Sequence, residues 1–422
     1  MYRPRMTLAF DPDRPEVLAD PYPLYRRLRA EDPVHDSDAL GGWVLTRYDD
    51  VKLALRDARF SADRATPFAE HMERDARPEL ARMGRILSQW VVFNDPPRHA
   101  VLRRLMVDAF TPRAAESLRA RIAEIVDDLI GRLKGRARLD LIADFAYPLP
   151  ATVIAHILGV PDRDLDRFRA WSDDLVAVIA SMRTLPDRMA RGALALAEVS
   201  DYLAGIVGAR KRSGARGALV DDLIAAHEAD DALSFDELVA NCVLILFAGH
   251  ETTTNLIGNG MRLLLERPDQ LARLSADRAL MAGAVEEMLR FESPAHSVAR
   301  VAAEDVELAG TTIRRGERVF AMIGAANRDP DLVDDPERFD VTRPPSRHLS
   351  FGYGPHFCVG APLARIEGEI ALARLLDAFP ALALEPGPLD WEPSLVLRGL
   401  KTLPLAVAGT ADRQEAKALA SQ

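Results

Sequence analysis

The spacing of apolar residues along the chain predicts a long helical part followed by a shorter part with strands. Up to about residue 290, most apolar side chains recur every three or four positions, which is the spacing of an amphipathic helix. Beyond that point β-branched runs take over, and Gly310 and Gly316 mark turns between them. The strand-like runs are Val298–Val301, Val306–Leu308, Val319–Ile323, Leu382–Leu384, Leu395–Leu397 and Leu403–Val407. The pattern therefore predicts a mainly α fold with minor antiparallel β.

Shorter elements precede this change, and two of the helices should begin where a capping residue is followed by proline. The expected elements are a helix from Asp20 to about Ala30, a strand over Trp43–Tyr48, a helix over Asp49–Asp57, a helix after Asn94–Pro97, and a helix from Thr111 to about Leu133. We expect residues 1–20 to wrap the surface and residues 409–422 to form a frayed, disordered tail. No linker separates two cores, so residues 1–422 are expected to form a single domain.

One helix should be much longer than the others. Ser234 and Glu237 form a capping box, and no proline interrupts the helical pattern before Pro268. More than thirty residues at 1.5 Å each give a length of about 50 Å, enough to cross the whole domain. One face of this helix carries Asn241, Ile245, Ala248, Gly249, Thr252 and Leu256.

The middle of this helix contains poor helix formers. Gly249 costs roughly 1 kcal/mol in a helix interior, and three threonines follow at 252–254. Two explanations fit. Another helix packs closely against Gly249, while threonine hydroxyls bond back to carbonyls one turn earlier. Alternatively, the helix opens locally where a small ligand binds and hydroxyls deliver protons.

Composition narrows the class of protein. The 54 basic and 64 acidic residues give a net charge of −10, which argues against nucleic acid as a main partner. Two cysteines in 422 residues indicate a reducing compartment without a disulfide framework. The N-terminus lacks an apolar signal core, and we expect no stretch long enough to span a bilayer. The chain is therefore expected to be cytoplasmic, off the membrane and monomeric.

The candidate chemistry lies in the glycine-rich segment from Phe351 to Gly360, which contains Cys358. Pro362 follows in what reads as the first turn of a helix. Free N–H groups and the helix dipole at such a start stabilise a thiolate. A thiolate is a nucleophile or a metal ligand. The only other cysteine, Cys242, is far away in sequence and reads as an inert core residue, so a zinc cysteine pair is not available.

This segment, Phe351-Gly-Tyr-Gly-Pro-His-Phe-Cys358-Val-Gly360, resembles the haem-ligand signature of the cytochrome P450 superfamily, with all six specified residues at the right offsets. The resemblance extends from about Pro21 to Leu405. It implies the cytochrome P450 fold, with the long central helix over haem, and haem b (iron protoporphyrin IX) with Cys358 as axial ligand. The chain is similar to the soluble bacterial members of the family.

The long helix carries a second point of resemblance. Ala248-Gly249-His250-Glu251-Thr252 is similar to the family's oxygen-activation motif. This implies that Thr252 hydrogen-bonds dioxygen at the iron and that Glu251 feeds it protons from solvent. An alcohol can relay a proton without placing a standing charge in a dry pocket. His250 is read as a packing or surface residue rather than a ligand.

Further positions match the family in order along the chain. The resemblance implies that His99, Arg103, Arg300 and His356 bind the haem propionates, with Phe351, Ala248 and Gly249 also against the cofactor. By spacing alone, His99 and Arg103 would read as a solvated helix face. Glu287 and Arg290, three apart on a helix, would join Arg343 in a structural network that holds the cysteine loop. Glu286 could equally pair with Arg290.

The resemblance implies a monooxygenase that inserts one oxygen atom of dioxygen into a small hydrophobic substrate by hydroxylation or epoxidation. Its electrons would come from a ferredoxin and a NAD(P)H-dependent ferredoxin reductase, docking on a basic patch that could include Arg104, Arg113, Arg347 and Arg365. Three alternatives stay open. They are a peroxide-using peroxygenase, a haem sensor without turnover, and a hydrolase or transferase with Cys358 as nucleophile and His356 as base.

The substrate class is the least specified part of the sequence analysis. The expected pocket residues are mostly apolar, and Asn241 and His296 are the candidates for orienting a substrate through hydrogen bonds. The full set is Ile86, Leu87, Trp90, Val91, Asn241, Leu244, Ile245, Ala248, Ala295, His296, Val298, Val396 and Leu397. A fatty acid, a terpenoid, a steroid and a macrolide all remain open.

Overall fold

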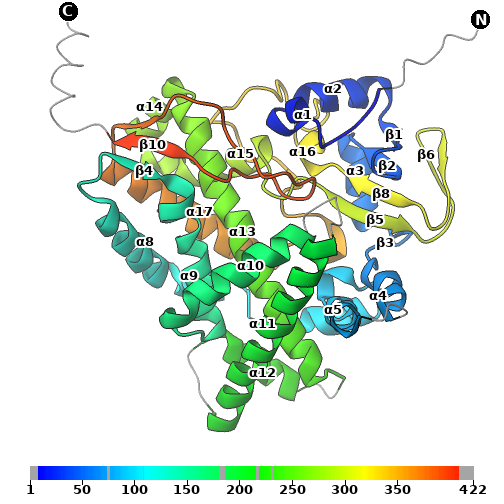
Figure 1. Cartoon of the computed structure of the whole chain (residues 1–422). Helices are drawn as coiled ribbons and strands as arrows, with labels where there is room; N and C mark the ends of the chain where they lie inside the picture. Colours follow the sequence, from blue (N-terminus) through cyan, green and yellow to red (C-terminus); the bar gives the residue numbers. More distant parts are fainter. Residues whose placement is uncertain are drawn as a thin grey trace, which may run out of the picture.

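The computed structural model describes residues 8–73, 77–107, 109–179, 186–214, 218–229 and 232–407. Helices make up most of this part of the chain (Figure 1). The helices are α1 Pro15–Ala19, α2 Tyr22–Glu31, α3 Tyr48–Arg56, α4 Ala65–Glu73, α5 Pro78–Ser88, α6 Arg98–Val107, α7 Pro112–Ser117, α8 Arg119–Leu133, α9 Pro148–Leu158, α10 Leu165–Ile179, α11 Pro186–Ser213, α12 Leu219–Glu228, α13 Phe235–Leu265, α14 Pro268–Ala276, α15 Met281–Phe291, α16 Ile323–Ala326 and α17 Ala361–Ala378.

Short strands gather at two places beside the helices. The strands are β1 Val34–Ser37, β2 Gly42–Leu45, β3 Phe60–Ser61, β4 Arg138–Asp140, β5 Val298–Ala302, β6 Val306–Leu308, β7 Thr311–Ile313, β8 Arg318–Ala321, β9 Leu382–Leu384 and β10 Pro404–Val407. A five-stranded sheet has the order β1-β2-β8-β5-β3, a three-stranded sheet the order β4-β10-β9, and β6 and β7 form a hairpin. All pairs are antiparallel except β2 with β8. The predicted fold class, mainly α with minor antiparallel β, is confirmed.

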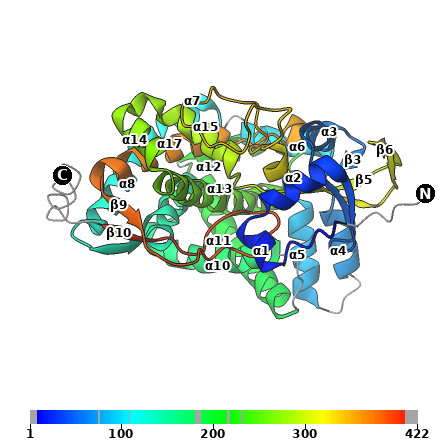
Figure 2. The same ribbon diagram turned by 90° about the horizontal axis from the view of Figure 1, so that it is seen from above.

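Helix α13 runs through the middle of the helical part in both views (Figures 1 and 2). It spans 31 residues, and Ser234 caps its start by accepting a hydrogen bond from the Glu237 N–H, as the capping box predicted. It packs against α9, α11, α15 and α17. Because most of its side chains are buried, α13 is the element against which the rest of the helical part is organised.

Several element boundaries differ from the sequence-based expectation. The helix expected from Thr111 to Leu133 is two helices, α7 and α8, which join at Leu118. The strand expected over Leu395–Leu397 is wrong, because only Leu397 makes an isolated bridge, to Ala295. The N-terminal segment does more than wrap the surface, since Leu8 and Phe10 are buried in a cluster with α2. Residues 1–7 and the predicted tail 409–422 lie outside the described residues.

Helix α11 is the one element in the described part of the chain that is long and apolar enough to cross a membrane by length and composition. Asp187–Ser213 meets this criterion by its mean hydropathy, although Glu198 and Asp201 interrupt it, so it is not the uninterrupted apolar stretch that the sequence analysis considered. The helix packs against α5, α10 and α13 and buries Leu196, Val199 and Leu203. Packing among helices accounts for its apolar face.

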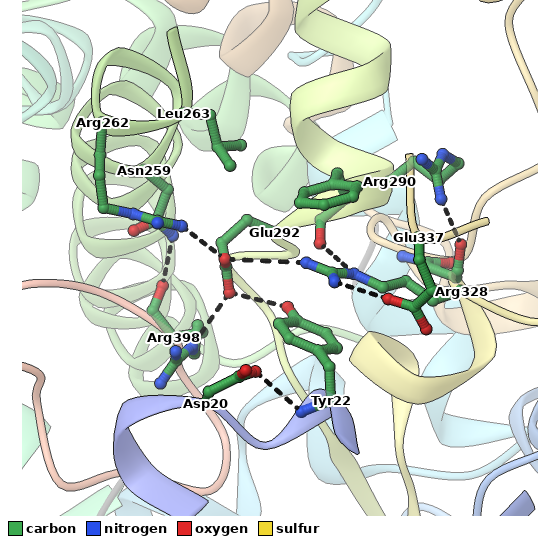
Figure 3. Close-up of polar contacts among 12 residues, drawn as sticks. Asp20, Tyr22, Asn259, Arg262, Leu263, Arg290, Glu292, Arg328, Glu337 and Arg398 are labelled. Atoms are coloured by element: carbon green, nitrogen blue, oxygen red, sulfur yellow. Dashed lines mark hydrogen bonds and ion pairs between the residues drawn. The ribbon is translucent and has the colours of Figure 1, made fainter. Parts of the chain in front are cut away.

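A buried ionic cluster joins the N-terminal helices to the end of α13 and to the C-terminal loop (Figure 3). The Glu292 carboxylate, 4% exposed, accepts hydrogen bonds from Arg262 at 2.6 Å, from Arg398 at 3.0 Å and from the Tyr22 hydroxyl at 2.7 Å. Arg328 lies 3.9 Å away. Burial alone would raise the pKa of Glu292, but Arg398, Arg262 and Arg328 hold it down, at about 2.

Replacing Glu292 with glutamine is expected to lower the free energy of unfolding by about 2–3 kcal/mol at neutral pH, because three buried guanidinium groups lose their counter-charge. The folded pKa of about 2 lies below the ordinary value of 4.5, so the contribution is complete above pH 4.5 and is lost as pH falls toward 2. Urea unfolding of both proteins between pH 7 and pH 3 measures this.

The matched control is Glu266→Gln, which removes a partner of Arg262 that is 30% exposed and should cost less than about 1 kcal/mol. A gap between wild type and Glu292→Gln that stayed constant down to pH 3 would contradict the role of the carboxylate charge.

Candidate active site

An apolar cavity of about 290 Å³ lies between α13 and the loop that carries Cys358. From α13, the side chains of Leu244, Ile245, Ala248 and Thr252 face it, and from the loop, those of Phe351 and Cys358. Further residues from several elements complete the wall: Val91, Val92, His99, Arg103, Met106, Phe110, Leu289, Pro294, Ala295, Val298, His356, Leu363 and Glu367. The two motifs singled out in the sequence, a hundred residues apart, thus meet across one space.

The glycine in the middle of α13 is explained by close packing. A Cβ on Gly249 would lie 2.5 Å from Cδ1 of Ile154 on α9, so any other residue would require the Ile154 side chain to move. The Thr252 hydroxyl donates to the Ala248 carbonyl at 3.0 Å, and the Thr253 hydroxyl to the Gly249 carbonyl at 3.2 Å. The helix is continuous from Phe235 to Leu265. Of the two explanations for this segment, the structure has the packed helix and not the local opening.

The glycines of the cysteine loop allow it to fold back on itself. Gly352 and Gly354 have φ angles of 73° and 75°, in the left-handed region that favours glycine. The Cys358 N–H donates to the Phe351 carbonyl at 2.8 Å, which closes the loop. Helix α17 begins at Ala361 with Pro362 in its first turn, as predicted. The Cys358 side chain is therefore held at the cavity just ahead of a helix N-terminus.

The environment of the Cys358 sulfur raises the pKa of the thiol, whereas the sequence predicted a stabilised thiolate. Burial raises the pKa of the thiol, while the Gly360 N–H, Arg103, the Ala361 N–H and Arg365 lower it in part. The N–H groups at the helix start are present as expected, but burial outweighs them. A metal cation bound to the sulfur would stabilise the thiolate further, because a coordinating thiol loses its proton outright.

Cationic and protonatable groups gather at one side of the cavity. The imidazoles of His99 and His356 lie 4.2 Å apart between ring centroids. His99 is 4% exposed, and its Nε2 has no hydrogen-bond partner within the described residues. Burial and the neighbouring Arg300, His99 and Arg103 lower the pKa of His356 to about 3. Burial likewise lowers the pKa of Arg103 and, to about 10, that of Arg300.

The sequence analysis missed a further member of this group, Arg64. Its Nε is buried without a hydrogen-bond partner in the described structure, its guanidinium stacks 4.9 Å above the Phe93 ring, and burial lowers its pKa to about 10. Arg64 also lowers the pKa of Arg300 by repulsion, whereas Asp95 raises it. Arg64 precedes α4 in an irregular segment, so no periodicity in the sequence pointed to it.

A bound anion would stabilise the three arginines of this group and would favour protonated His99 and His356. A group with an apolar body, a metal for the Cys358 sulfur and carboxylates for Arg64, His99, Arg103, Arg300 and His356 would satisfy every one of these features. The cavity therefore fits haem, the cofactor that the sequence resemblance implied.

A second ionic network joins α15 to the segment that precedes the cysteine loop. Arg290 is fully buried and forms a two-pronged ion pair with Glu287, at 2.6 and 2.7 Å. Arg343 reaches the same carboxylate at 3.2 Å, and Arg290 also donates to the carbonyls of Asn327 and Pro336. The predicted trio of Glu287, Arg290 and Arg343 is thus in contact. Glu286 does not join it, but pairs with Arg365 at 2.6 Å and with His348 at 3.2 Å.

Glu251 and Thr252 face two different spaces. Thr252 lines the apolar cavity, whereas Glu251 lines a polar chamber of about 500 Å³ on the other side of α13. His250 is 1% exposed and packs against Tyr147, as a packing residue would, and it also contacts Glu251.

The expected substrate pocket is only partly the cavity that the structure has. Val91, Leu244, Ile245, Ala248, Ala295 and Val298 line it. Seven expected residues lie outside it: Ile86, Leu87, Trp90, Asn241, His296, Val396 and Leu397. Arg300 does not line it either, although its charge lowers the pKa of His356 at its edge.

The two polar candidates among these seven residues are engaged elsewhere. The Asn241 side chain accepts from the Val91 N–H at 3.0 Å and donates to the carbonyls of Gln89 and Glu237. His296 packs between Tyr22 and Tyr25, with Nε2 at 3.0 Å from the Tyr25 hydroxyl, and burial lowers its pKa to about 3. Both side chains hold segments together and do not reach a substrate in this arrangement.

Glu367 on α17 is a cavity residue that sequence reasoning missed. Its side chain is fully buried, neither carboxyl oxygen has a hydrogen-bond partner in the described part of the chain, and burial raises its pKa to about 8. The group is therefore a neutral acid at neutral pH. Its position in an ordinary helical pattern carried no signal.

Comparison with known proteins shows which family and which proteins this chain is similar to. The family model described as Cytochrome P450 matches residues 43–397. "Cytochrome P450 107B1" of Saccharopolyspora erythraea is 44% identical over 94% of this chain and 97% of its own length. "Cytochrome P450 monooxygenase PikC" of Streptomyces venezuelae is 42% identical, over 92% of each. The crystal structure of P450BioI with a hexadec-9Z-enoic acid ligated acyl carrier protein superimposes with a TM-score of 0.86 at 37% identity, covering 93% of this chain and all of that one.

Proposed function

The chain belongs to the cytochrome P450 superfamily, and from that premise we propose that it is a haem-thiolate monooxygenase that inserts one oxygen atom of dioxygen into a small hydrophobic substrate. Its relatives are named monooxygenases and hydroxylases, so the protein is an oxidoreductase of this kind. The finer parts of the proposal are the axial ligand, the electron donor and the substrate class.

The observation that carries the proposal is the group of three arginines and two histidines at one side of the cavity, opposed in the described structure by the Asp95 carboxylate. Arg64, His99, Arg103, Arg300 and His356 would hold the two carboxylates of haem b, and the Cys358 sulfur would hold its iron. When bound, the haem supplies the capacity to activate dioxygen with electrons pushed from the thiolate. The protein contributes binding, orientation and proton supply.

The apolar lining of the cavity is the reason for proposing a hydrophobic substrate. Leu244, Ile245, Ala295 and Val298 expose hydrocarbon only, so they would exclude water and hold a hydrophobic molecule beside Thr252. A similar structure holds a fatty-acyl chain, which is compatible with this lining. The Thr252 hydroxyl would give up its bond to the Ala248 carbonyl and pass a proton to the reacting oxygen.

Electrons are proposed to arrive from a ferredoxin and its NAD(P)H-dependent reductase, docking on the side of the cysteine loop. Arg104, Arg113 and Arg347 are exposed there, while Arg365 is already paired with Glu286. A peroxide-using enzyme is the second candidate, but the acid and alcohol at Glu251 and Thr252 favour dioxygen, since a peroxygenase has less need of a proton relay.

Turnover under isotopically labelled dioxygen tests the proposal. With a surrogate ferredoxin, its reductase and NAD(P)H, product from a hydrophobic substrate should carry one labelled atom per molecule. If product forms only with added peroxide and takes its oxygen from that peroxide, the peroxygenase reading is right. A spectral-shift screen over fatty acids, terpenoids, steroids and macrolides first selects the substrate.

Replacing Thr252 with alanine is expected to uncouple electron use from product formation. NAD(P)H consumption should stay within about two-fold of wild type, while product per NAD(P)H falls about 10- to 100-fold and hydrogen peroxide is released. The matched control is Thr152→Ala on α9, which removes the same kind of back-bond, to the Pro148 carbonyl, away from the cavity. Unchanged coupling in Thr252→Ala would remove Thr252 from the relay.

A further inference from the structure

His250 is the only histidine on α13, and it is buried. Both of its ring nitrogens have partners in the described structure. Nδ1 lies 2.7 Å from the Leu246 carbonyl oxygen, which can only accept, so Nδ1 carries a proton. Nε2 lies 2.7 Å from the Ser172 hydroxyl and 3.1 Å from Oε1 of Glu251. The ring also packs edge-on against Tyr147 at 5.4 Å between centroids. These contacts fix the ring orientation and the tautomer.

The contact between His250 and Glu251 needs one proton. If Nε2 is unprotonated and Glu251 is a carboxylate, two acceptors face each other at 3.1 Å, which is repulsive. A proton on either atom converts the contact into a hydrogen bond. Among the described residues, His250 is the only basic side chain within ion-pair distance of Glu251. The pair therefore holds one exchangeable proton at a buried position next to Thr252.

The polar chamber gives this pair access to further protons. Its wall brings the carboxylates of Glu251, Asp173 and Glu392 together with four cations, Arg169, Arg188, Arg191 and Lys401. Burial raises the pKa of Asp173 and of Glu392, and the Glu251 carboxylate adds to both shifts. Tyr147 also lines the chamber and is hydrogen-bonded to Ser172, which contacts His250. A chain of polar groups thus runs from the chamber to Nε2.

We propose that His250 is a positioning residue that shares a proton with Glu251, and that the chamber on the outer face of α13 supplies the protons that this pair passes toward Thr252. The proposal rests on the monooxygenase function proposed above, which requires protons on the cavity side of α13. It adds proton sharing to the interpretation of His250 as a packing residue and assigns a role to Ser172 and Asp173.

The proton balance of one step is simple. The shared proton moves from Nε2 of His250 to Oε1 of Glu251, and Glu251 passes it on toward the Thr252 hydroxyl. The imidazole is then neutral, with its proton on Nδ1, and accepts a hydrogen bond from Ser172. Ser172 passes its proton to Nε2 and takes another from the chamber through Tyr147 or Asp173. One proton enters, one leaves, and no electron moves.

The charge state of His250 depends on groups from every element packed against it. Burial alone would lower its pKa, but Glu251 on the same helix, the Leu246 carbonyl and Asp173 on α10 raise it. Arg169 stacks on Tyr147 at 4.6 Å and opposes Asp173. The net effect of these groups is a raised pKa, which favours the protonated ring that shares its proton with Glu251.

Nitrogen NMR of the ¹⁵N-histidine-labelled ferrous carbon monoxide complex, which is diamagnetic, tests the shared proton directly. The chain has nine histidines, so the signals of His250 can be assigned from the spectrum of His250→Phe. We expect Glu251→Gln to lower the pKa of His250 by about one pH unit or more, because the anionic partner is lost. If His250→Phe does not fold, the signals that Ser172→Ala shifts give the assignment.

A His250 ring that stays neutral with the same titration in wild type and in Glu251→Gln would overturn the proposal. The outcome is independent of thiolate ligation and of turnover. A protein without thiolate-ligated haem defeats that function, while the coupling of His250 to Glu251 is read from the ring nitrogens.

Turnover measurements give a second test of the proposal. His250→Phe, which keeps the aromatic packing on Tyr147, should lower product per NAD(P)H about 3- to 10-fold and change the pH dependence of that ratio. The matched control is His156→Asn, an exposed histidine on α9 that should match wild type. A folded His250→Phe protein with the wild-type pH profile would overturn the role in proton supply.

Discussion

Replacing Cys358 with alanine is expected to abolish thiolate ligation of the haem and to lower monooxygenase turnover by on the order of 10³-fold or more. Among the described residues that line the cavity, Cys358 is the only one with a thiol, so no neighbour can take its place. The loop itself should survive, because it is closed by the backbone bond from Cys358 N–H to the Phe351 carbonyl. The carbon monoxide spectrum of the reduced variant, with turnover, measures both effects.

Cys242 provides a matched control for this experiment. It lies on α13, is fully buried outside the cavity, and burial raises the pKa of its thiol to about 12, so it is inert. Cys242→Ala should keep the thiolate spectrum and lose about 1 kcal/mol of stability from a small packing defect. A thiolate spectrum that persisted in Cys358→Ala would show that the ligand assignment is wrong.

Replacing Glu287 with alanine is expected to yield protein that is largely unfolded or free of haem. The change leaves the fully buried Arg290 without its carboxylate, and breaking a buried ion pair costs about 3–5 kcal/mol. Domains of ordinary stability have only about 5–15 kcal/mol in total. Arg343 loses the same partner, and the Asp340 N–H loses an acceptor. Circular dichroism, urea unfolding and haem content per chain measure the result.

Glu286→Gln is the neighbouring control for this prediction. Glu286 is 19% exposed and pairs with Arg365 and His348, so its loss should cost about 1 kcal/mol and leave the haem content unchanged. A Glu287→Ala protein that folded with full haem content and wild-type stability would contradict the supporting role of the network.

The parts of the fold that followed from sequence are those specified by local signals. The capping box at Ser234 and the absence of proline before Pro268 predicted α13 to within a few residues. The glycine-rich segment before Pro362 predicted a loop ahead of a helix, and α17 begins there. The contacts among Glu287, Arg290 and Arg343 were predicted from the family resemblance. Spacing alone would not have paired Arg343 with the other two.

The parts that did not follow depend on packing between distant segments. Leu395–Leu397 is apolar and β-branched enough for a strand, but it runs beside 293–298 with a single bridge and hydrogen bonds to Val396 and Leu395 carbonyls. His296 faces Gly324, where a Cβ would lie within 2.3 Å of its ring, so that glycine gives it a place away from the cavity. Neither the pairing of 395–397 with 293–298 nor the approach of His296 to Gly324 can be predicted from the local sequence.

The same reason explains the candidate site residues that were missed. Arg64 comes from an irregular segment, and only the folded chain brings it to Arg300. Glu292 follows α15 without a motif, yet three arginines from different elements converge on it (Figure 3). His250 read as a packing residue because its partner Ser172 lies 78 positions earlier in the sequence.

The reduced carbon monoxide difference spectrum of the purified wild-type protein tests the central claim most directly. Haem bound in the cavity with Cys358 as ligand predicts the long-wavelength band of a thiolate-ligated complex, at one haem per chain. A short-wavelength band typical of histidine ligation, or a colourless protein that takes up no haem, would contradict it.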